Sequence, residues 1–183
     1  FICYDNEAYM NTGIQRSGAT PMGAWTTTTP TGTKQKGNIT FKKDMPMIVA
    51  AHHVPYVATA CISYPMDFIN KVAKAKELKG FRYIQVLCPC PTGWRFETNK
   101  TVELGRLAVE SGMWTLYEIE NGKVTVNHRP RRWRSVKEYV ESQGRFSHMT
   151  DEMVQTLQEF VDAKLRELGL AAEPPVPPMP TPA

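Results

Sequence analysis

The sequence has no apolar run that approaches the roughly 20 residues of a membrane-spanning helix. It has no internal repeats, and its contents of hydrophobic (42%) and charged (22%) residues are those of ordinary globular proteins. These absences argue against a membrane protein, a repeat protein and a disordered chain. With 183 residues, the chain is long enough to bury one core without disulfides or structural metal ions.

Cysteines are few and unevenly spaced. Cys3, Cys61, Cys88 and Cys90 do not form the pattern of a secreted disulfide framework, so a cytoplasmic location is expected. Cys3 and Cys61 lie in apolar segments, where a buried inert thiol is the expected state. No targeting segment is visible, and the first residue is Phe rather than Met, as in a chain that begins within a larger protein.

The chain has a modest excess of basic over acidic residues, with a net charge of +4. The dense basic run is RPRRWR at residues 129–134. Arg and Trp together suit phosphate contacts and base stacking, but a solvated loop or a docking patch for an acidic protein is the favoured interpretation. Since no matching basic face or nucleic-acid motif accompanies the run, no nucleic-acid partner is expected.

Strand patterns and helix patterns alternate along the chain. Phe68, Ile69, Val72 and Ala75, for example, share one face of a helix that Pro65 opens. Such alternation predicts an α/β fold with a mostly parallel sheet flanked by helices. The expected strands cover residues 1–4, 56–61 and 83–87; the expected helices cover 46–52, 65–78, 98–111, 135–142 and a C-terminal helix at 150–168; and residues 114–119 and 123–127 form a β-hairpin around Asn121-Gly122.

Two segments have little apolar periodicity. Residues 14–45 are rich in Thr, Gly and Lys, and so long a loop inside a compact domain is usually functional. Residues 171–183 are dominated by Pro and are expected to be extended and disordered. The expected domain therefore covers residues 1–170, followed by a disordered Pro-rich tail at 171–183.

Polar residues follow the first apolar segment in the sequence YDNEAYMNTG, residues 4–13. Their side-chain and backbone oxygens would gather at the carboxyl end of a strand, where open α/β sheets bind ligands. Such oxygens suit Mg²⁺, usually together with phosphates. Asp, Asn and Gly also favour a purely structural turn, and on spacing alone that is the better supported interpretation.

A longer string decides between these interpretations. Residues 5–13, continued by IQRSGATP at 14–21 and AWT at 24–26, closely resemble the β subunit of pyruvate:ferredoxin oxidoreductase and its 2-oxoacid relatives. A second motif, VLCPCPTGW at 86–94, extends the resemblance, which reaches residue 146 and ends before the Pro-rich tail. The resemblance implies a thiamine diphosphate-binding fold, of which residues 1–170 would be the C-terminal portion.

The same resemblance implies roles for individual residues of the turn. Asn6 matches a position whose side chain binds Mg²⁺, and Ala8 matches one whose backbone carbonyl binds the same ion, which holds thiamine diphosphate. Asn11 matches a polar residue beside the thiazolium and substrate, so it is the catalytic candidate, although a turn-capping role stays open. Thr12 and Gly13 are implied to line the same pocket.

Cys90 matches the last cysteine ligand of a [4Fe–4S] cluster that takes electrons from thiamine one at a time. Clusters commonly need four thiolate ligands, and no CxxC pair in this chain completes the set. Cys88 does not match a ligand position, although on an extended chain its side chain could face the same way as that of Cys90.

Several parts of the implied enzyme are missing from the sequence. The family's Gly-Asp-Gly motif, with another Mg²⁺ ligand, and the remaining cluster cysteines would lie in an N-terminal β portion. The Glu that activates thiamine would come from the α subunit or domain, since Glu7 is a poor candidate for this role. The γ/δ components, ferredoxin, coenzyme A and the 2-oxoacid are further expected partners, and no membrane partner is expected.

The predicted reaction is the oxidative decarboxylation of a 2-oxoacid, with pyruvate expected, to acyl-CoA, CO₂ and reduced ferredoxin, or its reverse. Branched-chain 2-oxoacid:ferredoxin oxidoreductases share the motifs and remain an alternative. A non-redox thiamine-dependent decarboxylase or synthase half would keep the turn but have no use for Cys90. An inactive assembly module would explain why both sites are incomplete.

Overall fold

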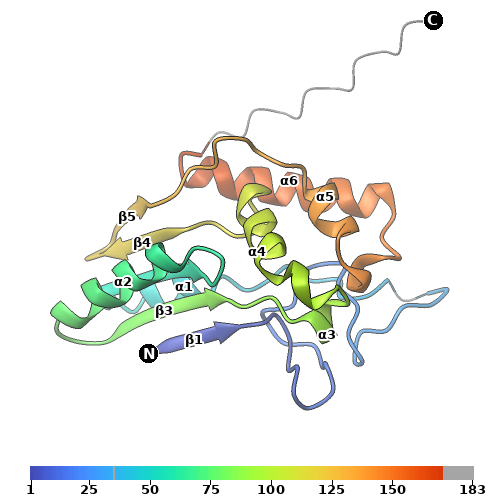
Figure 1. Cartoon of the computed structure of the whole chain (residues 1–183), viewed down its shortest axis with the longest axis horizontal. Helices are drawn as coiled ribbons and strands as arrows, with labels where there is room; N and C mark the ends of the chain where they lie inside the picture. The colour runs from blue at the N-terminus through green and yellow to red at the C-terminus, as the bar shows by residue number, and fades with distance from the viewer. Residues whose placement is uncertain (35, 171–183) are drawn as a thin grey trace, which may run out of the picture.

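A five-stranded mixed sheet in the order β1-β3-β2-β4-β5 forms the centre of the computed structural model, which describes residues 1–34 and 36–170 (Figure 1). The strands β1 (Ile2–Asp5), β3 (Arg82–Leu87) and β2 (Tyr56–Cys61) are parallel. The predicted hairpin, β4 (Tyr117–Glu120) and β5 (Lys123–Val126), joins β2 antiparallel and forms one edge. The predicted α/β class is confirmed, and the predicted tail lies outside the described residues.

The three parallel strands end level with one another. Asp5 of β1 and Cys61 of β2 both pair with Leu87 of β3, so their carboxyl ends share one edge. Every residue of β2 is buried, as is typical of a central strand covered on both faces. The polar turn that follows β1 therefore starts at the edge where such sheets bind ligands.

Short helices cover both faces of the sheet, and a larger core lies beyond the carboxyl ends of the strands. α2 packs Phe68 and Val72 against one face, and α1 packs Met45 and Val49 against the other. Trp94 and Leu116 are fully buried in the larger core. The helices are α1 (Met45–Ala50), α2 (Pro65–Glu77), α3 (Pro91–Trp94), α4 (Thr101–Glu110), α5 (Val136–Glu141) and α6 (Asp151–Glu167).

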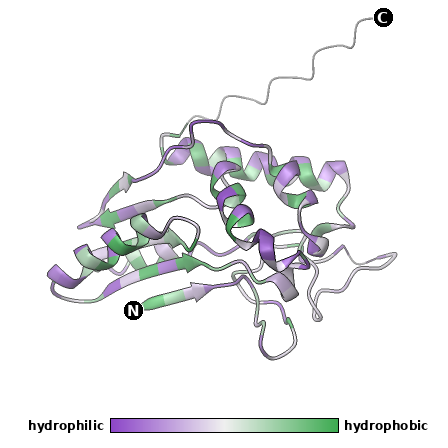
Figure 2. Ribbon diagram, in the orientation of Figure 1, coloured by the Kyte–Doolittle hydropathy of each residue, from purple (hydrophilic) through white to green (hydrophobic). Residues whose placement is uncertain are grey.

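The hydrophobic bands on the ribbon follow this packing. In Figure 2, α4, α5 and α6 alternate between hydrophobic and hydrophilic segments, whereas the long loop after β1 is mostly pale or hydrophilic. α6 confirms the predicted C-terminal helix, and it buries Leu157, Val161 and Leu165 on one face. No helix of the described residues combines the length and apolarity needed to cross a membrane.

The predicted face of α2 is partly wrong. Ile69 is 55% exposed, whereas Lys71 is buried. Lys71 is tolerated inside because its Nζ donates to the Thr59 carbonyl (2.8 Å) and to the Asp67 carboxylate (2.7 Å). A buried ammonium group needs such hydrogen-bond partners, and the spacing of apolar residues does not predict them.

Some boundaries also differ from those expected. The helix predicted at residues 98–111 is a 3-10 turn (Thr98–Lys100) followed by α4, and the short α3 after Cys90 is an addition. The strand predicted from residue 114 begins at Tyr117. Trp114 instead turns inward, where its indole N–H donates to the Ala60 carbonyl (2.9 Å).

The long loop is held in place by hydrogen bonds rather than by regular structure. The Asn38 side chain donates to the carbonyls of Thr20 (2.8 Å) and Thr40 (2.8 Å) and accepts from Arg16 (2.9 Å). The loop is also fixed to the distant end of the chain, because the Trp25 amide donates to the Arg145 carbonyl (2.8 Å). These contacts explain how a segment without apolar periodicity keeps one conformation.

Gly105 on α4 lies against the end of β2 and the residues that follow it. A Cβ atom there would lie 2.1 Å from Ser63 Oγ and 3.1 Å from Cys61 Sγ. Gly105→Ala should therefore lower the free energy of unfolding by about 1–3 kcal/mol, although Gly→Ala in an open helix is stabilising by about 1 kcal/mol.

Urea unfolding of the full chain measures this effect, with Arg106→Ala at the neighbouring exposed position as control. Equal stability of the wild type and Gly105→Ala would contradict the close packing of α4 on β2.

Candidate functional site

The turn after β1 is built around a buried acidic residue in an unusual backbone conformation. Glu7 has a φ of 68° and its side chain is 3% exposed. Asp5 stabilises this turn, because its Oδ1 accepts a hydrogen bond from the Glu7 amide (2.9 Å). Thr20 Oγ1 donates to the Glu7 carbonyl (2.7 Å) from the long loop. The conformation is thus determined by the surroundings, as strained residues at sites usually are.

Two buried carboxylates of the turn are neutralised by two cations from distant segments, and we call these residues the four-charge cluster: Asp5, Glu7, Lys42 and Arg145. Lys42 Nζ lies 2.6 Å from Asp5 Oδ2 and 2.9 Å from Glu7 Oε1. Arg145 Nη2 lies 2.7 Å from Glu7 Oε2. The formal charges cancel, which is the condition for burying so many ionised groups.

Aromatic rings surround the cations of the four-charge cluster. The Arg145 guanidinium stacks on the Trp94 ring at 3.8 Å, and Lys42 Nζ lies 4.7 Å from the Trp114 ring centroid. Arg145 also donates to the Tyr139 hydroxyl (3.2 Å). Such cation–π contacts partly replace the water that the buried cations have lost.

Glu7 and Lys42 both have pKa values that favour their charged forms. Burial, the largest single influence, raises the pKa of Glu7, but the attraction and hydrogen bonds of Lys42 and Arg145 together lower it below its ordinary value. For Lys42, burial lowers the pKa, whereas Glu7 and Asp5 raise it above the ordinary value. Glu7 is therefore a fixed carboxylate with two cationic partners and a poor proton carrier.

The residues predicted to bind metal lie at the base of the turn. Asn6 and Ala8 are half-buried on either side of Glu7. The Asn6 carbonyl accepts a hydrogen bond from the Trp94 indole N–H (2.8 Å), so the turn touches α3. The Asn6 side chain and the Ala8 carbonyl form no hydrogen bond with the other described residues, and amide and carbonyl oxygens of this kind fit Mg²⁺.

The other turn residues sit farther out. Asn11, Thr12 and Gly13 are exposed in a small loop that the pairing of Tyr9 with Gln15 closes. Thr12 contacts Gln15 through two hydrogen bonds, and the Gly13 carbonyl accepts from Thr27 Oγ1 (2.8 Å). The described chain therefore shapes this loop without enclosing it as a pocket.

The structure brings Cys90 next to the turn. A Cβ atom on Gly93, in α3, would lie 2.1 Å from Met10 Sδ and 3.7 Å from Cys90 Sγ. Met10 belongs to the turn, and Cys90 immediately precedes α3. Two motifs that are about 80 residues apart in sequence thus form one patch, in which Met10 packs against the backbone of Gly93.

Cys88 and Cys90 pack in different places. Cys90 contacts the large core that contains Trp94, whereas Cys88 packs on the α2 face of the sheet. The idea that both thiols face the same way is therefore wrong. Burial raises the pKa of the Cys88 thiol to about 11, and fully buried Cys61 likewise has a raised pKa. All four cysteines are free thiols.

No group of three or more His, Cys, Asp or Glu residues that could hold a metal ion occurs within residues 1–34 and 36–170. Sequence patterns did not identify Lys42, Arg145 and Gln85, whose Nε2 donates to Asp5 Oδ2 (2.5 Å). The sequence indicates these partners only indirectly. Asp5 and Glu7 come at the end of an apolar strand, and carboxylates buried there need cationic or hydrogen-bonding partners.

The first 86 residues match the family model described as thiamine pyrophosphate enzyme, C-terminal TPP binding domain. This match confirms the predicted thiamine diphosphate-binding fold. The matched residues include β1, α1, β2, α2 and all but the last residue of β3.

Three relatives extend the similarity over almost the whole chain. Pyruvate synthase subunit PorB of Methanothermobacter thermautotrophicus is 59% identical over 170 residues, which is 93% of this chain and 59% of the relative. PorB of Methanocaldococcus jannaschii is 55% identical, covering 93% of this chain and 57% of the relative. Ketoisovalerate oxidoreductase subunit VorB of Pyrococcus furiosus is 48% identical, covering 94% and 56%.

The predicted resemblance is thereby confirmed. The chain spans 56–59% of the length of these three relatives, so its similarity concerns a part of each subunit.

The four-charge cluster predicts a large effect for a small change. Glu7→Gln keeps the shape of the side chain but leaves the buried Arg145 without its carboxylate, so the free energy of unfolding should fall by about 3–5 kcal/mol. Urea unfolding of the full chain measures this, with Glu159→Gln on the exposed face of α6 as control.

The pH dependence gives a second measurement. Because the folded pKa of Glu7 is lowered, its contribution is present above the unfolded value of about 4.5 and is lost as the pH falls through the folded pKa. The difference in stability between wild type and Glu7→Gln should shrink in that acidic range. A difference at pH 7 below about 1 kcal/mol, typical of an exposed ion pair, would contradict the buried cluster.

Proposed function

We propose that this chain, which is similar over 93% of its length to pyruvate synthase subunit PorB, is the thiamine diphosphate-binding β component of a 2-oxoacid:ferredoxin oxidoreductase. Pyruvate is the proposed substrate, and the products are acyl-CoA, CO₂ and reduced ferredoxin, or the reverse. The observation that carries the proposal is the contact between the oxygen-rich turn and the Cys90 segment at the carboxyl edge of the sheet.

Asn6 and Ala8 would supply two oxygen ligands to the Mg²⁺ ion that holds the diphosphate. Their place beside the rigid Glu7 supports this role, since Mg²⁺ demands well-fixed oxygen ligands. When bound, thiamine diphosphate supplies the electron sink for decarboxylation, which no side chain of the protein provides. Asn11 would lie beside the reacting atoms, and Thr12 and Gly13 would line the same pocket.

Cys90 would be one thiolate ligand of a [4Fe–4S] cluster. Its half-buried position near Met10 supports this assignment, because an electron acceptor must lie close to the cofactor. Cys88 points to another part of the structure and is not proposed as a ligand. The remaining cluster cysteines and the Asp of Gly-Asp-Gly would come from an N-terminal β portion.

The open edge of β1 supports docking of such a portion. In the described chain β1 pairs with β3 alone. Next to the edge of β1 that has no partner strand among the described residues, Phe1 (73% exposed) and Tyr4 (72% exposed) present apolar surface. Parallel strands are usually covered by other parts of the protein and seldom form a solvent-exposed edge. Residues 1–170 would then be the C-terminal portion of a larger thiamine diphosphate domain.

Other components must supply the remaining chemistry. Glu7 cannot act as the activating carboxylate, because Lys42 and Arg145 already occupy both of its oxygens. An α subunit or domain would supply that Glu. The γ/δ components, ferredoxin, coenzyme A and the 2-oxoacid complete the proposed partners, and the four free thiols support a cytoplasmic setting.

A branched-chain 2-oxoacid is the second candidate substrate. It is supported by the 48% identity to ketoisovalerate oxidoreductase subunit VorB.

The role of Cys90 predicts a selective loss of iron. Cys90→Ser in the assembled enzyme should remove the iron of one cluster and abolish ferredoxin reduction, since an oxygen ligand replaces a thiolate poorly. Iron analysis and ferredoxin reduction measure the effect, and Cys88→Ser is the matched control. Iron content and rate equal to the wild type would rule out the assignment.

The role of Asn6 predicts a loss of cofactor without a loss of iron. Asn6→Ala should weaken the retention of thiamine diphosphate by roughly tenfold or more, equivalent to about 1.4 kcal/mol, because Mg²⁺ loses a ligand. Cofactor titration of the assembled enzyme measures this, with exposed Asn70→Ala as control. An unchanged affinity would show that Asn6 does not bind the ion.

A further inference from the structure

A cavity of about 550 Å³ lies between α6, the β4–β5 hairpin and the segment that leads into α1, and Lys42 of the four-charge cluster forms part of its wall. A volume of this size is typical of pockets that receive ligands or anchoring side chains. Its walls are mainly apolar and aromatic and include Phe41, Trp114, Tyr117, Val126, Leu157 and Phe160. The proposed function leaves this cavity without a role.

The loop between β5 and α5, residues 127–134, borders the cavity, and we call it the basic loop. Arg129 lines the cavity and donates a hydrogen bond to the Gly169 carbonyl (3.3 Å). The Asn127 amide donates to Leu116, the Arg134 amide donates to Glu110, and both bonds are 2.9 Å. The loop is therefore anchored at both ends.

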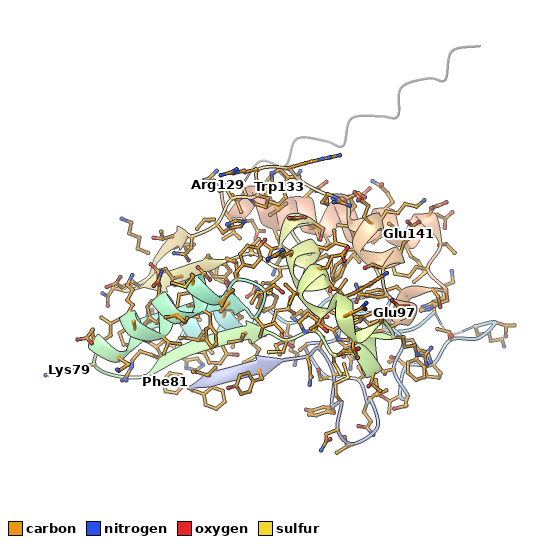
Figure 3. The ribbon with its side chains drawn as sticks, in the orientation of Figure 1. Lys79, Phe81, Glu97, Arg129, Trp133 and Glu141 are labelled. Atoms are coloured by element: carbon orange, nitrogen blue, oxygen red, sulfur yellow. The ribbon has the colours of Figure 1, made fainter. Side chains whose placement is uncertain are left out.

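The basic loop displays cationic groups that the described chain does not neutralise. Arg129, Arg131 and Arg132 are exposed, and none of them forms an ion pair with residues 1–34 or 36–170. Trp133, which follows Arg132, packs partly on the core. In Figure 3, Arg129 and Trp133 lie beside α6, on the opposite side of the molecule from Lys79 and Phe81.

We propose that the cavity and the basic loop together form a docking site for an acidic segment of another protein. A large apolar side chain of that segment would enter the cavity, and its flanking carboxylates would pair with Arg129, Arg131 and Arg132. An apolar pocket beside Arg and Trp side chains is the usual composition of the centre of a protein interface. The planar guanidinium group of Arg can bind a carboxylate through two parallel hydrogen bonds.

The surroundings favour a protein over a nucleic acid. The carboxylates of Glu138 and Glu110 lie near the basic loop, since a hydrogen bond from Arg134 to Glu138 and the charge of Glu110 both raise the pKa of Arg134. These carboxylates would repel a phosphate backbone on one side of the short basic loop. Nucleic acids usually need a longer cationic groove with stacking platforms, whereas the cavity here suits a single apolar anchor.

The proposal is tested by calorimetric titration of the full chain with a synthetic Glu-rich peptide that carries one central Phe. The wild type should bind the peptide, and Arg131→Glu together with Arg132→Glu should weaken binding by about tenfold or more. The double change Lys76→Glu with Lys79→Glu, which carries the same change of charge on the far side, should alter binding less than about twofold.

The cavity has its own matched pair of variants. Val124→Trp, at an exposed position that lines the cavity, should block the anchor, whereas Val102→Trp on α4 should not. Replacing the central Phe of the peptide by Gly should have the same effect as blocking the cavity. Circular dichroism confirms that each variant is folded.

Three results would overturn the proposal. They are no binding to the wild type, equal binding by both double variants, and tighter binding of a DNA duplex than of the peptide. Because the peptide titration does not involve thiamine or iron, its outcome is independent of the outcome for Asn6 and Cys90.

Discussion

The neutralisation of two buried carboxylates is the constraint on which the functional end of this structure depends. Asp5 and Glu7 follow directly after β1 and are buried where the sheet meets its largest core. Lys42 comes from the end of the long loop and Arg145 from the segment after α5. Removing either cation would leave an uncompensated buried charge, so the loop and the C-terminal half must fold around the turn together.

This arrangement explains why the turn can be rigid without regular structure. Glu7 keeps a left-handed conformation because its backbone and both of its carboxylate oxygens are bound. Asn6 and Ala8 are held in place because they flank Glu7. Cys90 lies close to Met10 because Gly93, in α3, has no side chain to separate them. The oxygens of the turn and a thiol thus lie together at one edge of the sheet, which is the geometry that supports the proposed redox role.

Structural features that depend on local sequence patterns could be predicted, whereas contacts between residues far apart in the sequence could not. The strands, the hairpin at Asn121-Gly122 and the face of α6 follow from periodicity and turn chemistry. Lys71 inside α2 could not be predicted, because its partners are a strand carbonyl and Asp67.

The site shows the same division. The turn residues and Cys90 were recognisable by their motifs, but the partners that fix the turn were not. Lys42 and Arg145 lie about 35 and 138 residues from Glu7, and no spacing rule connects them. For Cys88 and Cys90 the local rule was misleading. The two-residue spacing of an extended chain suggested that both side chains face the same way, but they pack in different hydrophobic clusters.

We propose that this chain carries part of a thiamine diphosphate site, which is fixed in shape but depends on other parts of the enzyme for its function. Calorimetric titration with thiamine diphosphate and Mg²⁺ tests it, comparing the chain alone with the chain assembled with an N-terminal β portion and an α component. We expect tight, Mg²⁺-dependent binding by the assembly and at least a hundredfold weaker binding by the chain alone, a difference of about 2.7 kcal/mol. Equal affinity in both, or no binding by the assembly, would contradict it.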